Sequence, residues 1–105
     1  MTTEELIVRA GRALVAAAPP ASRVILFGSY ARGDGRSGSD LDFLVIEPDL
    51  DHSASESVRL RRALRDLPAA IDVVVVSRDL AERRSKVPGT MIDRALREGR
   101  VIAES

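Results

Sequence analysis

Two aspartates that flank a single leucine, Asp40 and Asp42, are the residues best suited to chemistry in this sequence of 105 residues. They open an apolar run, and side chains alternate between faces along a strand, so both carboxylates should project from the same side. Neighbouring carboxylates repel one another and are costly to remove from water. A divalent cation such as Mg2+ prefers oxygen ligands and would offset that repulsion. The alternative for Asp40 is a turn or N-cap residue, whereas Asp42 lies inside the strand-like run.

A glycine–serine pair, Gly28-Ser29, ends the apolar run that precedes these aspartates. A glycine between a strand and a helix lets a phosphate approach the backbone closely, and a serine there adds a hydroxyl donor. The simpler interpretation is a tight turn followed by an N-cap serine. Arg32 and Arg36 follow in the connection, where they either clamp phosphates or remain solvated loop charges. Ser39 either orients a nucleotide or caps the turn.

A third carboxylate, Asp72, lies between Ile71 and Val73 in the most apolar run of the chain. An aspartate is badly placed in a core unless something binds it, and the alternative is a strand end that faces water. Three acidic side chains on neighbouring strands would hold two metal ions about 3.5–4 Å apart, as a two-metal site requires. A phosphate turn beside such a site indicates nucleotide chemistry.

The elements that must position these residues alternate between helix and strand, which favours a single α/β domain over residues 1–105. The run 71–76 is apolar enough to predict a central strand. Helices are predicted from Thr2 to Pro19, over 29–32, from a cap at Ser53 or Ser55 to Pro68, over 80–86 and from Thr90 to Gly99. Strands are predicted over 24–27, 41–46 and 71–76, with a short edge strand over 101–102.

Composition excludes several classes of protein. The net charge is zero, so the molecule as a whole has no polyanion-binding signature. An arginine row over 59–65 lacks interleaved aromatic residues, so the nucleic-acid signal is weak and a solvated helix face is expected. The absence of cysteine excludes disulfides and thiolate metal sites. The N-terminus is acidic and has no apolar segment of signal-peptide or membrane-spanning length, so we expect a cytoplasmic protein without membrane contact.

The order Gly28-Ser29, ten intervening residues, Asp40-Leu41-Asp42 and a later strand aspartate, Asp72, resembles the polymerase-beta-like nucleotidyltransferase superfamily. The small size is similar to its minimal branch, the antitoxins of HEPN-domain toxins in two-gene modules. The resemblance covers nearly the whole chain and ends with the segment Leu96-Arg97-Glu98-Gly99-Arg100-Val101. It implies the fold of that superfamily, a small mixed β-sheet with flanking helices.

The resemblance also implies roles for the residues above. Gly28 and Ser29 would hold the triphosphate of ATP, Asp40 and Asp42 would bind two Mg2+ ions, and Asp72 would join the ion on the attacking hydroxyl. The activity implied is transfer of AMP from ATP to a hydroxyl. In the HEPN-paired branch the acceptor is a tyrosine of the toxin, an RNase that is thereby neutralised. Two alternatives remain: a binding antitoxin that needs no catalysis, and a stand-alone nucleotidyltransferase acting on a small molecule or RNA.

Overall fold

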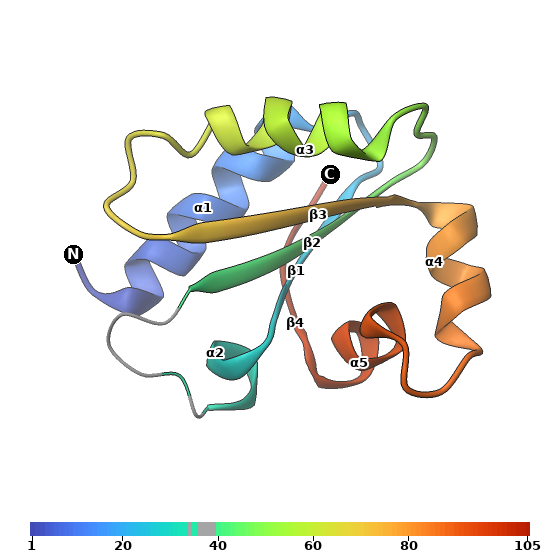
Figure 1. The fold of residues 1–105 in the computed structure, drawn as a ribbon. Coiled ribbons are helices and arrows are strands. Elements are labelled where there is room, and N and C mark those ends of the chain that lie inside the picture. The colour runs from blue at the N-terminus through green and yellow to red at the C-terminus, as the bar shows by residue number, and fades with distance from the viewer. Residues whose placement is uncertain (34, 36–39) are drawn as a thin grey trace.

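Helices and strands alternate around one four-stranded sheet in the computed structural model, which describes residues 1–33, 35 and 40–105 (Figure 1). The helices are α1 (Thr3–Ala17), α2 (Ser29–Arg32), α3 (Ser53–Arg62), α4 (Arg78–Ser85) and α5 (Met91–Glu98), and the strands are β1 (Arg23–Phe27), β2 (Leu41–Glu47), β3 (Ile71–Ser77) and β4 (Arg100–Glu104). The strand order is β3-β2-β1-β4, with β2 and β3 parallel and β1 antiparallel to both β2 and β4. The mixed sheet with flanking helices is therefore confirmed.

Helices cover both faces of the sheet (Figure 1). On one face α1 and α3 pack over a core that contains Leu14, Phe43 and Leu60. On the other face α4 and α5 pack over a second core that contains Leu44 and Ala95. Successive strand residues alternate between the two faces. Asp42 therefore shares the face of Leu44, on the side of α4 and α5.

The prediction that residues 71–76 form a central strand was wrong, because β3 lies at an edge of the sheet. Its apolar sequence has another cause, since both of its faces are covered. Val73 and Val75 belong to the core beneath α3, and Val76 belongs to the core beneath α4. A strand in a parallel pair that is joined by a helical crossover is commonly buried on both faces, whether or not it is central.

Two serines of α3 satisfy the outer edge of β3. The hydroxyl of Ser53 donates to the carbonyl oxygen of Val75 at 2.6 Å, and that of Ser57 donates to the carbonyl oxygen of Val73 at 2.5 Å. An edge strand otherwise exposes unpaired backbone groups that invite pairing with another chain. The prediction that Ser53 or Ser55 caps this helix was wrong, because the N-cap is His52, whose side chain makes no capping hydrogen bond.

Two other helices, α1 and α5, begin at the capping residues that the sequence predicts. Thr2 caps α1 by accepting a hydrogen bond from the Glu5 amide, and Thr90 caps α5 by accepting one from the Asp93 amide. The predicted edge strand near residue 101 is confirmed as β4. Among the described residues, no helix combines the length and the apolar character needed to cross a membrane.

The arginine row of α3 has at least one structural member. Arg59 forms a two-point contact with the carboxylate of Glu56, at 2.6 and 2.8 Å, and also donates to the carbonyl oxygen of Ala17 at the end of α1. This arginine links the two helices that cover the same face of the sheet. Glu56 in turn lies beside Glu47, the last residue of β2, which is only 2% exposed.

The Glu47–Glu56 pair predicts a stability that depends on pH. Burial, together with the hydrogen bond and the charge of Glu56, raises the pKa of Glu47 to about 8. The folded state therefore retains a proton that the unfolded state releases near pH 4.5, so stability falls as the pH rises from about 4.5 to about 8. The steepest slope that one proton allows is about 1.4 kcal/mol per pH unit. Glu47→Gln should remove this contribution. The free energy of unfolding of the variant should therefore rise relative to that of the wild type as the pH increases.

Urea unfolding at pH 5, 6.5 and 8 measures this difference. Glu82→Gln, a change at an exposed glutamate of α4, serves as the control and should follow the wild type at each pH. A constant offset between Glu47→Gln and the wild type across this range would show that Glu47 is ionised throughout.

Candidate functional site

Gly28 joins β1 to the single turn of α2 in a backbone conformation that requires glycine. Its φ of 79° and ψ of −156° lie in a region that residues with a side chain essentially never adopt. A Cβ atom built at Gly28 would lie 2.5 Å from Oδ2 of Asp42. The glycine thus serves two purposes, because it makes the turn and leaves room for the Asp42 carboxylate beside the backbone.

The sheet brings Asp42 next to Asp72. The two residues are paired in register between parallel strands β2 and β3, and Asp42 is also paired with Phe27 of β1. Burial is the main cause that raises the pKa of Asp42, followed by the negative charges of Asp72 and Asp40. The charge of Arg32 acts in the opposite direction. Three carboxylates and one guanidinium therefore interact electrostatically at this point of the sheet.

The remaining predicted site residues lie around this pair. Asp40 precedes β2 and is exposed, and Ser29 is the first residue of α2. Arg32, the last residue of α2, lies 3.8 Å from the carboxylate of Glu98 in α5. The predicted roles of Arg36 and Ser39 fall outside the described residues.

Across residues 1–33, 35 and 40–105, no three acidic, histidine or cysteine side chains are already grouped closely enough to hold a metal ion. Carboxylates repel one another when no cation lies between them. Asp40 and Asp72 are both exposed, so their side chains have room to point away from Asp42. The donor chemistry nevertheless fits magnesium, which takes carboxylate oxygens from one or two residues and fills its other positions with water and phosphate. The in-register pair Asp42–Asp72 and the space at Gly28 are consistent with such an ion.

A cavity of about 400 Å3 adjoins Gly28 on the side of α5. Phe27 and Met91 are among its apolar lining residues, and Arg94 adds a positive charge. Sequence reasoning singled out none of these side chains as a site residue. Arg94 comes 66 positions after Gly28, and only the packing of α5 against the end of β1 brings the two together.

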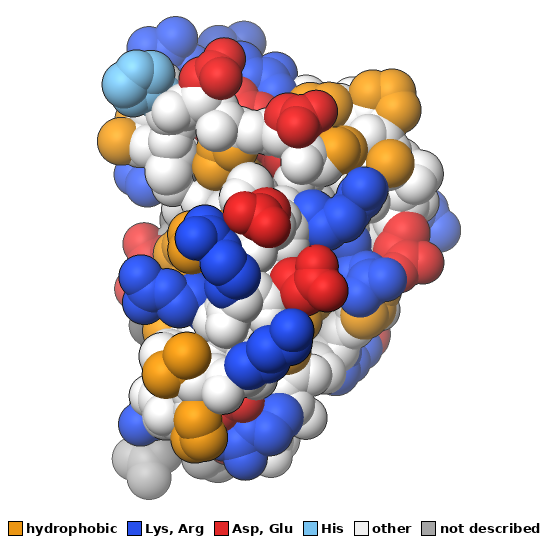
Figure 2. All heavy atoms as spheres, turned by 90° about the vertical axis from the view of Figure 1, so that its right-hand side faces the viewer, with side chains coloured by type: hydrophobic (Ala, Val, Ile, Leu, Met, Phe, Trp, Pro, Cys, Tyr) orange, Lys and Arg blue, Asp and Glu red, His pale blue; other side chains and the backbone are white. Residues whose placement is uncertain are grey.

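The face formed by α4 and α5 shows basic and acidic side chains interspersed, with no broad patch of one sign (Figure 2). A nucleic-acid interface needs a continuous basic surface. The face in Figure 2 shows no such continuous surface.

Comparisons with known proteins agree with this geometry. The family model for the nucleotidyltransferase domain matches residues 12–102. A candidate protein adenylyltransferase of Methanocaldococcus jannaschii is 35% identical over 81 residues, which are 76% of this chain and 76% of that protein.

Solved structures share the fold. A candidate nucleotidyltransferase of Sulfolobus solfataricus superposes with a TM-score of 0.65 at 19% identity, over 95% of this chain and 78% of that one. A complex of a tri-AMPylated Shewanella oneidensis HEPN toxin with an MNT antitoxin gives a TM-score of 0.61 at 18% identity, over 99% of this chain and 74% of that one. From its match to the family model, its identity to the archaeal relative and its fold, the chain belongs to the nucleotidyltransferase domain family.

Proposed function

We propose that this nucleotidyltransferase moves AMP from ATP, with Mg2+, onto a tyrosine hydroxyl of a HEPN-domain RNase toxin and thereby acts as its antitoxin. The observation that carries the chemistry is the in-register pair Asp42–Asp72 beside a turn that only glycine can make. The relatives support the choice of group and acceptor, since one is named a candidate protein adenylyltransferase and another is an MNT antitoxin with an AMPylated HEPN toxin.

In this mechanism the acceptor hydroxyl attacks the α-phosphorus of ATP in line with the leaving group. A bond forms between the hydroxyl oxygen and phosphorus, the bond to the bridging oxygen breaks, and pyrophosphate leaves with that electron pair. The carboxylate of Asp72 accepts the hydroxyl proton. Gly28 and Ser29 hold the triphosphate, and Arg32 supplies positive charge beside it. Most of the acceleration comes from positioning and charge neutralisation.

Asp40, Asp42 and Asp72 would hold two Mg2+ ions in this site. Bound magnesium would neutralise phosphate charge and favour ionisation of the attacking hydroxyl. The carboxylates would also repel one another less, because the charges that raise the pKa of Asp42 would be compensated. The partner supplies its own tyrosine.

Replacing both aspartates before and within β2 tests the proposal. The double variant Asp40→Ala/Asp42→Ala should lose at least about 100-fold in transfer, because the phosphates would no longer be held against positive charge. The measurement is transfer of label from α-labelled ATP, with Mg2+, to the protein product of the neighbouring gene, the proposed HEPN partner.

The chain offers a matched control with the same tripeptide. Asp49-Leu50-Asp51 repeats the pattern of Asp40-Leu41-Asp42 beyond the other end of β2, and both of its aspartates are exposed. Asp49→Ala/Asp51→Ala should label the partner like the wild type. An unlabelled partner, together with a stable complex that blocks toxicity even in the site variant, would establish a binding antitoxin. Turnover without any protein partner would establish a stand-alone enzyme.

A substitution at Gly28 should impair the site without removing a charge. In Gly28→Ala the new Cβ would contact the Asp42 carboxylate and displace it, and the backbone conformation would cost about 1–3 kcal/mol. We expect transfer to fall by roughly 10–100-fold, since each 1.4 kcal/mol of lost transition-state stabilisation is about tenfold in rate.

Gly33→Ala separates backbone strain from displacement of the carboxylate. Gly33 also has a positive φ, 83°, but a Cβ there meets no atom of the other described residues within 4 Å. It should lower the melting temperature and retain near-normal transfer. Equal losses of transfer in the two variants would show that strain at the turn, and not the position of Asp42, accounts for the effect.

A further inference from the structure

The site residues lie in a row across three neighbouring strands. Asp72 lies on β3, its register partner Asp42 on β2, and Phe27 and Gly28 at the end of β1 beside Asp42. The cavity of about 400 Å3 adjoins the β1 end of this row, between Arg32 and the helix α5. The row therefore has two different ends, the exposed side chain of Asp72 on β3 and a cavity at the end of β1.

The geometry of an in-line displacement indicates which end of the row receives the acceptor hydroxyl and which end receives the leaving pyrophosphate. The attacking and leaving oxygens lie on opposite sides of the phosphorus. If the acceptor hydroxyl approaches Asp72, as proposed above, pyrophosphate must depart toward β1. This inference thus rests on the proposed function, and it places the two outer phosphates of the nucleotide at the cavity.

The cavity holds a cation whose charge is not already paired. Among the residues that the structure describes, the side chain of Arg94 forms no hydrogen bond and no ion pair. Arg32, by contrast, has the carboxylate of Glu98 at 3.8 Å. The two arginines and the one glutamate that line this cavity leave one net positive charge in it.

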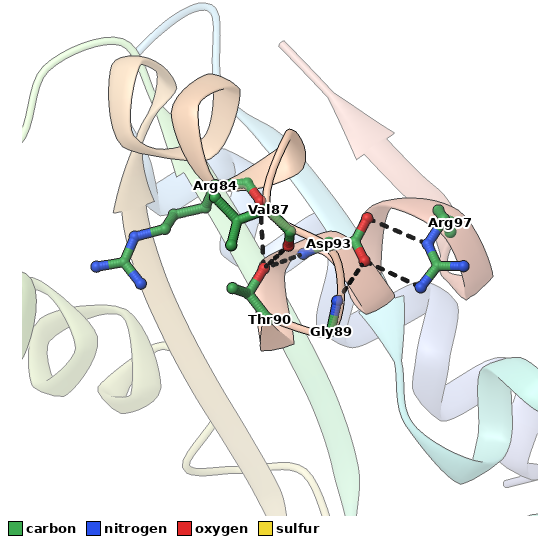
Figure 3. Close-up of polar contacts among 6 residues, drawn as sticks. All are labelled: Arg84, Val87, Gly89, Thr90, Asp93 and Arg97. Carbon is green, nitrogen blue, oxygen red and sulfur yellow. Dashed lines mark hydrogen bonds and ion pairs between the residues drawn. The ribbon is translucent and has the colours of Figure 1, made fainter.

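The neighbouring carboxylate of α5 is bonded mainly to other groups. Hydrogen bonds from Arg97 and Gly89 are the largest causes that lower the pKa of Asp93, and the charge of Arg94 is the smallest. Figure 3 shows Asp93 directed toward Arg97, which donates to both of its oxygens at 3.1 and 2.9 Å. The Gly89 amide donates to the same carboxylate at 3.0 Å, and the Asp93 amide donates to the hydroxyl of Thr90. These bonds fix the first turn of α5, from which Arg94 lines the cavity.

We propose that Arg94 is a further phosphate-binding residue, which contacts the β- and γ-phosphates of the nucleotide and stabilises them as they leave as pyrophosphate. A guanidinium is suited to this task because it is always charged and offers several donors in a planar fork. The apolar residues Phe27 and Met91 suggest a competing occupant, the base of the nucleotide, which the test below separates from the phosphates.

Binding of ATP, AMP and inorganic pyrophosphate to the full chain, measured by calorimetry with Mg2+ present, tests this role. Arg94→Ala should weaken the binding of ATP and of pyrophosphate by about 10–100-fold, which is the range for loss of charge-assisted hydrogen bonds. The affinity for AMP should be unchanged. Arg94→Lys should recover part of the loss, because it restores the charge but not the fork. Arg62→Ala, an exposed arginine of α3, should bind all three like the wild type.

Three results would overturn the proposal. If Arg94→Ala binds ATP and pyrophosphate like the wild type, and the wild type still transfers label, Arg94 has no phosphate-binding role and the proposed function is unaffected. An equal loss for AMP and ATP would assign the cavity to the base. A wild type that binds no nucleotide would overturn this inference and the proposed function together.

Discussion

The repulsion between carboxylates at the start of β2 and β3 is the constraint around which this small domain is arranged. The parallel pairing of the two strands sets Asp42 and Asp72 side by side. Burial, followed by the charges of Asp72 and Asp40, raises the pKa of Asp42. Such a pair is unfavourable unless a cation or protons compensate it. The crossover helix α3 keeps the strands parallel, and its serines satisfy the outer edge of β3. The glycine turn then gives the Asp42 carboxylate space against the backbone of β1.

Position in the sheet, not residue type, separates a candidate metal ligand from a surface charge. The tripeptide aspartate–leucine–aspartate occurs twice, once entering β2 and once after it. Asp42 faces a partner carboxylate across the strands, whereas Asp49 and Asp51 lie in an exposed loop. Only the first tripeptide continues into a strand.

Local signals accounted for most of the fold and for much of the candidate site. Apolar runs located the strands, and Thr2 and Thr90 marked two helix starts through ordinary capping. Gly28 was predicted as a turn glycine, and its backbone angles confirm that turn. These features depend on residues within a few positions of each other, so a single sequence contains the necessary information.

Features that depend on tertiary contacts were missed. The edge position of β3 depends on the order of strands, and an apolar run looks the same at an edge that helices cover as in the centre. Glu47 ends an apolar strand, and nothing in the sequence indicates that its side chain is buried. Only the fold places it against Glu56. Arg94 is one of many arginines in the sequence, and no local pattern indicates that it lines the cavity beside Gly28.

The affinity for ATP as a function of Mg2+ concentration tests the central claim most directly, because it asks whether the paired carboxylates hold a cation with the nucleotide. In the wild type, ATP should bind far more tightly with Mg2+ than in a metal chelator. Asp42→Asn should lose most of that difference, because it removes a proposed metal ligand and retains the shape of the side chain. Equal ATP affinity with and without Mg2+ in the wild type would contradict the account.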